Sequence, residues 1–516
     1  MTGAECLLRT LLSNGVDLCL ANPGTSEMQF VAALDRVEGM RGVLCLFEGV
    51  CSGAADGYAR MARKPAATLL HLGPGLGNAI ANLHNAKKAR VPLVNIVGQH
   101  ATAHLKYDAP LTADIEALAS VVSSYVRVVA SAEEVGAATA AVVSAALKPP
   151  GQVATLIAPA DFSWSEGGEP APAVPRPRNP VPSVEAVREA ARILCSGELA
   201  GLLLSGGALL APGMEAAGRV SRVTGAQVFM HRYAARYDRG AGRFEATRIP
   251  YFPEPAEEAL AGLKHLILVE TPPPVSFFAY PGRRSCLAPE DCLFHTLAST
   301  GQDGTAALDA LVQELGAGNA QAPVITQQRP SIARGGALTV EMIGRTLSAL
   351  LPEGAMISDE MVSSGGPVWE ALRASAPHSY MPNSGGAIGQ GLPLAVGAAL
   401  ACPEGKAVAL QADGSGMYTP QSLWTMGREK LNVVTVIFAN RRYRILDIEM
   451  RRTGADGFGP RAESLIDIGH PDLNWVKLAE GMGVEAGRAH TADEFARLLG
   501  VAMEQRGPWL IEAMLG

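Results

Sequence analysis

Asp413 and Asn440 are the residues whose types and positions most directly suggest chemistry. Asp413 follows an apolar run, residues 407–412, and Asn440 follows a β-branched run, residues 433–439. A carboxylate beside a carboxamide suits a hard cation, and the amides of Gly414-Ser415 at a nearby helix start suit phosphate oxygens. The pattern predicts a cation that bridges a diphosphate. A plain Asp-Gly turn between a strand and a helix is the simpler alternative.

The elements around these residues predict a strand–helix–strand unit. Residues 407–412 and 433–439 have the composition of buried parallel strands. Thr419-Pro420 between them predicts an N-cap followed by proline at the first helical position, and the helix would end near Lys430. Because the crossover makes the two strands parallel and adjacent, their carboxyl ends would meet at one edge, where open α/β sheets bind ligands.

The whole chain has the composition of a globular α/β protein. Its 516 residues, 48% hydrophobic and 18% charged, suggest about three domains. The formal charge of -7 gives no reason to expect nucleic acid or an anionic membrane as a partner. Eight scattered cysteines without a CxxC pair predict reduced thiols in a cytoplasmic protein. Asp17 interrupts the first apolar run, so we expect no signal peptide and, without a longer apolar run elsewhere, no membrane span.

Alternating strand and helix patterns predict three α/β domains, each a doubly wound parallel sheet. The expected domains are residues 1–165, 184–315 and 338–516, joined by a proline-rich linker at 166–183 and a second polar connection at 316–336. The expected strands are residues 17–21, 42–47, 66–71, 93–97, 201–204, 228–231, 265–269, 355–358, 407–412, 433–439 and 509–513. In the first domain we expect helices at residues 4–14, 52–62 and 79–90, with Gly73 to Asn78 leading into the last of these as a loop.

The residues around Asp413 carry a family resemblance. Ala412-Asp413-Gly414-Ser415, with 26 residues between Asp413 and Asn440, resembles the thiamine diphosphate (ThDP) signature Gly-Asp-Gly…Asn, with alanine for the first glycine. The resemblance extends over the whole chain and is to ThDP-dependent enzymes of the benzoylformate decarboxylase and acetolactate synthase large-subunit kind. The other matching segments are Asn22 to Glu27, Glu48, His71, Gly77-Asn78, Gly98-Gln99 and Ser384 to Gly386.

The resemblance implies a cofactor site. Asp413, Asn440 and the main-chain carbonyl of Arg442 would bind Mg²⁺. Diphosphate oxygens and water would complete the octahedral coordination of the ion. Ile388 would force the cofactor into its bent shape, and the carbonyl of Gly386 would accept a proton from the aminopyrimidine. The further implied cofactor contacts are Asn22, Gly24, Thr25, Asn78, Ser363, Ser364, Gly414, Ser415 and Tyr443. The glycines between residues 385 and 391 are equally explained by a loop that needs positive φ.

Two side chains are implied in catalysis. Glu48 would protonate the pyrimidine so that its imino form can deprotonate the thiazolium carbon; apolar neighbours favour the protonated form that this exchange needs. The residues alone, without the resemblance, favour the simpler alternative that Glu48 is a helix-N-terminal glutamate suited to the helix dipole. His71 would handle protons at the end of a strand, although a strand-end histidine is often structural.

The chain also departs from the decarboxylase pattern. No histidine stands near Ser276 to Ala279, where a second one is expected. Arg441, Arg442 and Arg444 follow Asn440; they suit an anionic substrate or a solvated helix face. His100 and His104 are further candidates for the border of the pocket. Ser205 to Ala208 form no full GxGxxG pattern, so no FAD is expected.

The resemblance implies an enzyme that decarboxylates 2-oxo acids, or ligates the resulting enamine to a carbonyl acceptor, or both. The substrate would be a small 2-oxo acid. Glu48 of one subunit and Asp413 of another would serve one site, which implies a homodimer or homotetramer. The alternatives are a C–C lyase of 2-hydroxy ketones, or a catalytically weak ThDP-binding partner subunit, against which an intact Glu48 argues.

Overall fold

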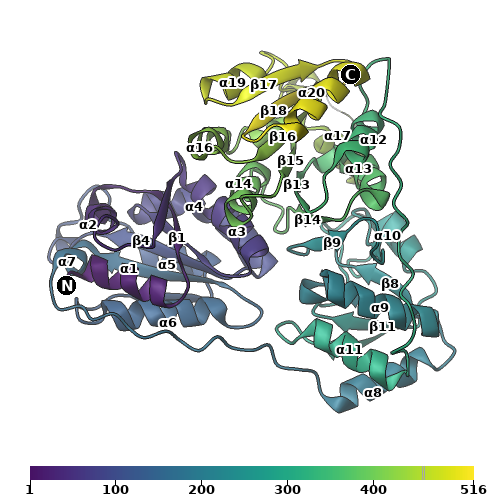
Figure 1. Cartoon of the computed structure of the whole chain (residues 1–516), viewed down its shortest axis with the longest axis horizontal. Helices are drawn as coiled ribbons and strands as arrows, with labels where there is room; N and C mark the ends of the chain where they lie inside the picture. The colour runs from purple at the N-terminus through teal and green to yellow at the C-terminus, as the bar shows by residue number, and fades with distance from the viewer. Residues whose placement is uncertain (456, 458) are drawn as a thin grey trace.

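The protein consists of three α/β lobes, each built on one sheet (Figure 1). The computed structural model describes residues 1–455, 457 and 459–516. The chain passes from the first lobe to the middle lobe through a long extended segment that follows residue 165 (Figure 1). Within the described residues every helix is too short or too polar to cross a membrane.

The first lobe is a six-stranded parallel sheet in the order β2-β1-β3-β4-β6-β5. Its strands are β1 (Leu18–Asn22), β2 (Arg41–Leu44), β3 (Ala66–Leu70), β4 (Leu93–Gln99), β5 (Tyr125–Val128) and β6 (Val153–Pro159). Its helices are α1 (Gly3–Ser13), α2 (Met28–Ala33), α3 (Glu48–Ala62), α4 (Leu72–Ala89), α5 (Ile115–Val122), α6 (Val135–Leu147) and α7 (Ala160–Trp164). Strand–helix alternation makes every pairing parallel, as the sequence predicts.

The middle lobe is a five-stranded parallel sheet in the order β10-β8-β7-β11-β12. Its strands are β7 (Ala200–Leu204), β8 (Gln227–Met230), β10 (Thr247–Arg248), β11 (His265–Val269) and β12 (Leu293–Ala298). Its helices are α8 (Val184–Leu194), α9 (Ala211–Thr224), α10 (Pro253–Ala259) and α11 (Gly304–Glu314).

The last lobe is a seven-stranded sheet in the order β17-β18-β16-β15-β13-β14-β9. Its strands are β9 (Tyr237–Arg239), β13 (Ala355–Glu360), β14 (His378–Pro382), β15 (Ala407–Ala412), β16 (Val433–Ala439), β17 (Glu485–Ala489) and β18 (Trp509–Met514). Its helices are α12 (Val340–Leu350), α13 (Gly365–Ala371), α14 (Gly391–Ala401), α15 (Asp413–Gly416), α16 (Gln421–Glu429), α17 (Arg444–Arg452), α18 (Pro460–Glu463), α19 (Trp475–Gly481) and α20 (Ala492–Glu504). Strand β9 comes from the middle segment of the sequence and pairs antiparallel with β14, so it ties the two lobes together.

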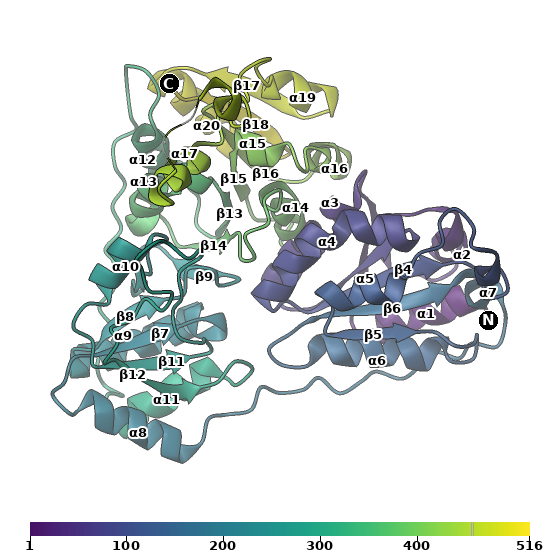
Figure 2. The same cartoon turned by 180° about the vertical axis from the view of Figure 1, so that it is seen from behind.

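Helices α3 and α14 join the first and last lobes (Figure 2). The backbones approach so closely that a Cβ on Gly57 would lie 2.1 Å from the Leu394 carbonyl oxygen, and one on Gly397 would lie 1.9 Å from that of Ala54. One apolar core runs across this contact and includes residues of both lobes. The small residues that the sequence places in α3 are therefore required by packing, because larger side chains would force the helices apart.

Three local predictions from the sequence are corrected. Helix α3 begins at Glu48 and not at residue 52, so Glu48 lies in the first turn. Helix α4 begins at Leu72, so the segment expected as a loop up to Asn78 is helical. Thr419 does not cap the following helix, which begins at Gln421; its hydroxyl donates to the carbonyl of Gly389 at 2.9 Å. Tertiary contacts decide these ends, which local propensity does not resolve.

Candidate functional site

Several strand ends of the first and last sheets carry backbone strain. Leu72 after β3, Val362 after β13 and Arg441 after β16 have φ values of 47°, 53° and 58°. Positive φ is costly for residues with a Cβ, most of all for a β-branched one such as Val362. Strain of this kind persists where the surrounding structure fixes it, often at ligand sites. It lies at the carboxyl edges of the two sheets, where the sequence predicts the cofactor.

Asp413 is a buried carboxylate at the end of β15. It is 2% exposed, and strands β15 and β16 pair in parallel, which places Asp413 and Asn440 at one edge as the sequence predicts. Its two oxygens accept the amides of Gly414 at 2.8 Å and Arg441 at 2.6 Å. Burial raises the pKa of Asp413, and these amides oppose the shift. Because amides alone do not neutralise a buried carboxylate, a nearby cation would stabilise it.

The segment after Asn440 folds onto this site. The Asn440 side-chain oxygen accepts the amide of Arg442 at 3.0 Å. The Arg442 guanidinium turns away and pairs with Asp447 at 2.5 Å and Glu463 at 2.9 Å. Arg442 is therefore held by carboxylates of its own segment, so its side chain is not free to receive an anionic substrate. Its main-chain carbonyl remains the predicted metal ligand.

The residues predicted to contact the diphosphate differ in how exposed they are and in which of their polar groups are already hydrogen-bonded. Ser364 is buried, whereas Ser363 is half-buried and follows the strained Val362. The Tyr443 ring lies over Gly414, where a Cβ would be 2.5 Å from the ring. The Ser415 hydroxyl accepts from Gln411 at 2.6 Å and donates to the carbonyl of Ala412 at 3.3 Å, which leaves its amide to face a ligand at the start of α15.

Glu360 organises the loop that precedes α14, and sequence reasoning did not single it out. One oxygen accepts the amide of Gly389 at 2.7 Å, and the other accepts the amide of Gly391 at 2.8 Å and the Gln411 side chain at 3.0 Å. It is 2% exposed, and burial raises its pKa against these donors. The signal in the sequence that could have pointed to Glu360 was a carboxylate just after the expected strand at residues 355–358, three residues before Ser363.

The loop of residues 385–391 carries the two residues predicted to hold the cofactor ring. Gly386 has φ 83° and its amide donates to the Asn383 side chain at 2.8 Å. A Cβ on Gly386 would lie 2.5 Å from the Phe277 ring. Ile388 is half-buried. Phe277 is thus the side chain beside Gly386, in the segment where the decarboxylase pattern expects a histidine.

Glu48 is buried in the first turn of α3 with its carboxylate beside Asn78. It is 7% exposed, and Asn78 donates to its Oε2 at 2.9 Å. Because α4 begins early, Asn78 lies one turn before Asn82, which donates to the carbonyls of Gly49 at 2.8 Å and Gly389 at 3.2 Å. The helical register thus lines up Glu48, Asn78 and the loop of residues 385–391. The loop that the sequence predicts at residues 73–78 does not reveal this alignment.

His71 is held by a carboxylate that sequence reasoning did not list as a site residue. Its Nδ1 lies 2.9 Å from Glu27 Oε2 and 3.2 Å from the Ser26 hydroxyl. Glu27 is 3% exposed and also accepts the amide of Gly24 at 2.7 Å. A Cβ on Gly24 would lie 2.2 Å from the His71 ring, so the ring itself requires glycine there. With Nδ1 facing a carboxylate, Nε2 is the nitrogen left to exchange a proton.

The remaining candidate residues make fewer contacts with the groups described above. Asn22 and Thr25 lie half-buried or exposed beside this pair, at the end of β1 and in the short turn after it. The His100 and His104 rings lie 5.4 Å apart, and Nε2 of His100 is buried without a hydrogen-bond partner among the described residues. Arg444 is exposed at the start of α17. The structure does not bring these residues into the network of Glu48 or of Asp413.

Comparison with known proteins identifies the class. Residues 1–118 match the family model "Thiamine pyrophosphate enzyme, N-terminal TPP binding domain", and residues 363–513 match "Thiamine pyrophosphate enzyme, C-terminal TPP binding domain". The chain therefore belongs to the thiamine pyrophosphate enzyme family, as its motifs predict. Both matches contain residues described above, Glu48 in the first and Asp413 in the second.

Among individual relatives, the chain is 49% identical over 517 residues to "Putative acetolactate synthase large subunit IlvX" of Mycobacterium tuberculosis, covering 100% of this chain and 99% of that protein. It is 28% identical to benzoylformate decarboxylase of Pseudomonas aeruginosa, covering 97% and 96%. The structure resembles the thiamine diphosphate-dependent 4-hydroxybenzoylformate decarboxylase of Rhodococcus jostii with a TM-score of 0.88, 23% identity and coverage of 100% and 99%. The last likeness confirms the predicted fold class.

Proposed function

We propose that this protein is a ThDP- and Mg²⁺-dependent enzyme that decarboxylates a 2-oxo acid and transfers the remaining acyl unit to a carbonyl acceptor. The observation that carries the proposal is the buried Glu48 carboxylate, held by Asn78 at the start of α3. A degenerate cofactor-binding subunit would have no need of such a group. The relatives named as acetolactate synthase and benzoylformate decarboxylase support the substrate class.

The residues present fit the cofactor. Asp413 is a buried carboxylate at the start of α15, next to the backbone amides of its first turn, and Asn440 follows the neighbouring strand. Asp413, Asn440 and the Arg442 carbonyl would hold Mg²⁺, while Gly414, Ser415 and Ser363 would hold the diphosphate. When bound, ThDP supplies the electron sink for loss of CO₂. No flavin is part of the proposal.

Residues of the chain itself would then position the cofactor and handle its proton. Glu48 would hold a proton against the pyrimidine nitrogen, and Asn78 would fix the carboxyl group in that orientation. The Gly386 carbonyl would orient the exocyclic amine, with Phe277 excluding water from the same place. Glu360 would fix the conformation of the loop of residues 385–391, because it accepts backbone amides on both sides of residue 390.

We further propose that the enzyme is a homodimer or homotetramer with the sites at the subunit interface. Large apolar side chains are exposed beside both halves of the site: Leu46 at 47%, next to Glu48, and Val362 at 42% and Tyr418 at 52%, next to the diphosphate residues. Exposed apolar groups around a polar site are typical of surfaces that a second chain covers. The proposed domain limits are those predicted from the sequence, residues 1–165, 184–315 and 338–516. Strand β9 belongs to the middle segment of the sequence but pairs with the last sheet.

Simple decarboxylation is the second candidate, and the Glu27–His71 pair favours it. A histidine oriented by a carboxylate is suited to deliver a proton to carbon, which would release an aldehyde in place of a ligated product. The absence of a histidine from the segment around Phe277 favours ligation.

Product analysis separates these functions. Purified protein with ThDP and Mg²⁺ is incubated with pyruvate, benzoylformate, phosphonopyruvate or an oxalyl-type donor, and CO₂ and carbon products are followed. Acetolactate from pyruvate alone establishes the ligase, and aldehyde without ligation establishes the decarboxylase. Tight ThDP binding without turnover of any donor would overturn both in favour of a silent partner subunit. Glu48→Ala with full activity would contradict the role of Glu48.

A further inference from the structure

Two arginines without carboxylate partners lie at the carboxyl edge of the middle sheet. Arg248 ends β10, which pairs with β8 so that Arg248 lies beside Met230, and Arg232 follows the end of β8. Arg232 is half-buried, and its guanidinium forms neither an ion pair nor a hydrogen bond with any residue that the structure describes. Ligands of open α/β sheets bind at this edge.

The missing partner of Arg232 distinguishes it from other arginines at the junction of the lobes. Arg60 and Arg239, which are buried there, each pair with a carboxylate. Asp359 is the carboxylate whose charge acts on Arg232, but its oxygens already accept a tyrosine hydroxyl at 2.7 Å and a backbone amide at 3.0 Å. Burial lowers the pKa of Arg232, and so does the neighbouring charge of Arg248. Two like charges in a half-buried place are unfavourable unless an anion joins them.

Tyr233, next to Arg232, carries a second unused donor. Its hydroxyl is buried and has no hydrogen-bond partner among the described residues, although buried polar groups are nearly always hydrogen-bonded. Burial raises the pKa of Tyr233 to about 12, so the hydroxyl keeps its proton at neutral pH. Tyr237 fixes the backbone of this segment by donating to the carbonyls of His231 and Arg232, both at 2.6 Å. A guanidinium beside a phenol hydroxyl suits a carboxylate, which accepts from both.

Aromatic rings connect these donors to the proposed cofactor site. The Phe277 ring lies against Gly386. The rings of Tyr233 and Tyr251 lie 5.3 Å and 5.6 Å from the Phe277 ring, and the guanidinium carbon of Arg232 lies 5.7 Å from the Tyr251 ring. A layer of aromatic side chains thus separates Arg232 from Gly386. That placement suits a charged group at the far end of a substrate, and not the carboxylate next to the reacting carbonyl.

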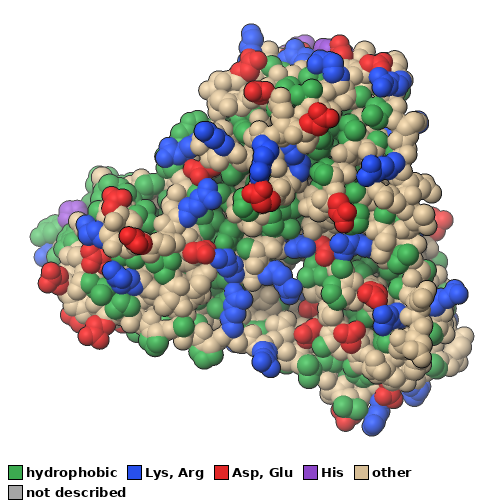
Figure 3. Space-filling model, in the orientation of Figure 1, with side chains coloured by type: hydrophobic (Ala, Val, Ile, Leu, Met, Phe, Trp, Pro, Cys, Tyr) green, Lys and Arg blue, Asp and Glu red, His purple; other side chains and the backbone are tan. Residues whose placement is uncertain are grey.

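We propose that Arg232 and Tyr233 bind the distal carboxylate of a 2-oxo dicarboxylic acid, which stays in the product when the carboxylate next to the 2-oxo group leaves as CO₂. This inference rests on the proposed function and names the class of donor for the same site. Figure 3 shows Lys and Arg side chains gathered beside the hollow between the first and middle lobes, and basic side chains attract a ligand with two negative charges.

The test compares ligands that differ in one terminal group, with the full-length protein saturated with ThDP and Mg²⁺. Glutarate and pentanoate lack the 2-oxo group, so calorimetry measures their binding without turnover. Release of CO₂ compares 2-oxoglutarate with 2-oxopentanoate. Arg232→Met removes the charge, Arg232→Lys keeps it, and Tyr233→Phe removes only the hydroxyl. Arg222→Met, at an exposed arginine of α9 in the same lobe, is the matched control.

Wild type and Arg222→Met are expected to bind glutarate at least about tenfold tighter than pentanoate, and to prefer 2-oxoglutarate in kcat/KM by a similar factor. Arg232→Met should lose about 10- to 100-fold of both preferences, chiefly through KM, and Arg232→Lys should recover part of them. Tyr233→Phe should lose about 3- to 10-fold, because a neutral donor contributes less than a charged one.

The contrary outcomes separate this inference from the proposed function. Equal binding of glutarate and pentanoate by a wild type that turns over other 2-oxo acids would refute the inference and leave the proposed function intact. Glutarate binding that depends on Arg232, in a protein that turns over no donor, would keep the carboxylate site and overturn the proposed function.

Three further results would overturn the role of Arg232. They are an unchanged preference in Arg232→Met, an equal loss of kcat/KM for both donors, and a preference for a carboxylate that appears only when pyruvate replaces acetaldehyde as the acceptor. If Arg232→Met does not fold, Tyr233→Phe decides by the same comparison, and an unchanged preference in that variant refutes the inference.

Discussion

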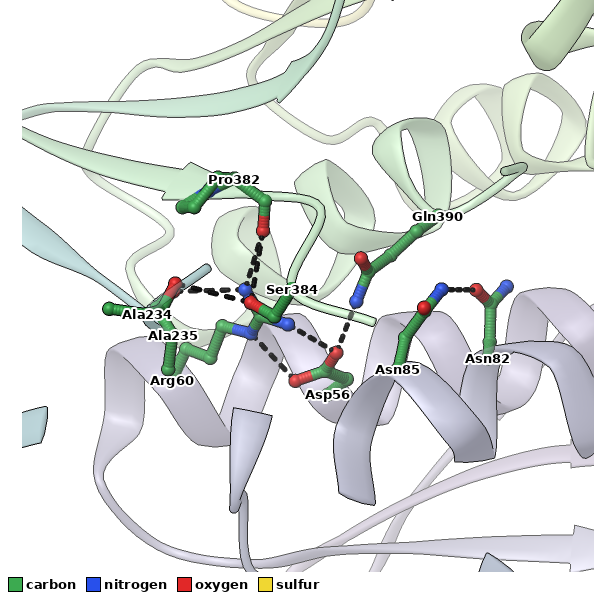
Figure 4. A network of polar contacts seen from close by, with 9 residues as sticks. All are labelled: Asp56, Arg60, Asn82, Asn85, Ala234, Ala235, Pro382, Ser384 and Gln390. Atoms are coloured by element: carbon green, nitrogen blue, oxygen red, sulfur yellow. Dashed lines mark hydrogen bonds and ion pairs between the residues drawn. The ribbon is translucent and has the colours of Figure 1, made fainter. Parts of the chain in front are cut away.

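The buried Asp56–Arg60 pair lies where the three lobes meet, and its removal gives the sharpest test of how they are held (Figure 4). Both side chains come from α3 and are 0% exposed. Arg60 donates to both oxygens of Asp56 at 2.7 Å, and its third nitrogen donates to the carbonyls of Ala235 at 2.9 Å and Pro382 at 3.0 Å. Gln390 donates to Asp56 at 2.5 Å. Arg60 therefore needs Asp56 to remain buried as a cation.

Asp56→Ala leaves the Arg60 charge buried without its partner. Breaking a fully buried pair in this way costs about 3–5 kcal/mol, whereas an exposed pair contributes about 0–1 kcal/mol. With a urea dependence of about 2–3 kcal/mol per molar, the first unfolding midpoint should fall by about 1–2 M. Tryptophan fluorescence during urea unfolding measures that midpoint. Glu215→Ala, which breaks the exposed pair with Arg219 at the same i,i+4 spacing, is the matched control and should change it little.

Two further measurements test whether the loss of stability comes from the unpaired Arg60 charge. The loss in Asp56→Ala should persist at about 0.5 M salt, because buried charges are poorly screened. Replacing both partners, as Asp56→Leu with Arg60→Met, should restore much of the stability, since no unpaired charge then remains. A midpoint for Asp56→Ala that equals that of Glu215→Ala would refute the reasoning that this pair supports the junction.

Three other perturbations address the sites. Glu48→Gln should lower turnover by about 100- to 10,000-fold with ThDP still bound, because it removes the proton carrier, whereas Glu38→Gln at an exposed position should not; CO₂ release measures this. Asp413→Ala should weaken Mg²⁺-dependent retention of ThDP by at least about 100-fold, measured by equilibrium dialysis with and without EDTA. Burial raises the pKa of Glu270 to about 7, above its ordinary value of 4.5, so ionisation opposes folding: stability should fall as pH rises from 4.5 through 7, by about 3 kcal/mol at most. Glu270→Gln should lack this decline in melting temperature between pH 5 and pH 8.

Each of these has a clear contrary outcome. Undiminished turnover of Glu48→Gln would place the proton relay elsewhere. Retention of ThDP by Asp413→Ala in EDTA would show that the diphosphate is held without the metal. Parallel melting profiles of wild type and Glu270→Gln across this pH range would mean that Glu270 does not titrate there.

Much of the fold was predictable because hydrophobic patterning is local. The strands at residues 407–412 and 433–439 have the predicted bounds, and their parallel pairing follows from the helix between them. The position of Asp413 and Asn440 at one edge of the sheet was predictable for the same reason. Family membership, too, could be inferred from motif spacing and is confirmed by the two matching domain models.

The early starts of α3 and α4 were not predictable, because glycine-rich segments have weak propensity and are made helical by packing across lobes. That register decides which side chains face one another: Asn78 against Glu48, and Asn82 against Gly389. The pairing of β9 with β14 depends likewise on contacts between distant segments.

Residue types and spacing along the chain thus determine the family, the three sheets and the strand ends that carry Asp413, Asn440 and His71, because each depends on short-range pattern. Only the tertiary structure decides which buried carboxylates fix neighbouring segments: Glu360 binds the loop of residues 385–391, Glu27 binds His71, and Glu270 accepts a backbone amide in the middle lobe. The physical reason is that a buried carboxylate is tolerated only where several donors converge, and those donors come from segments that the sequence leaves far apart.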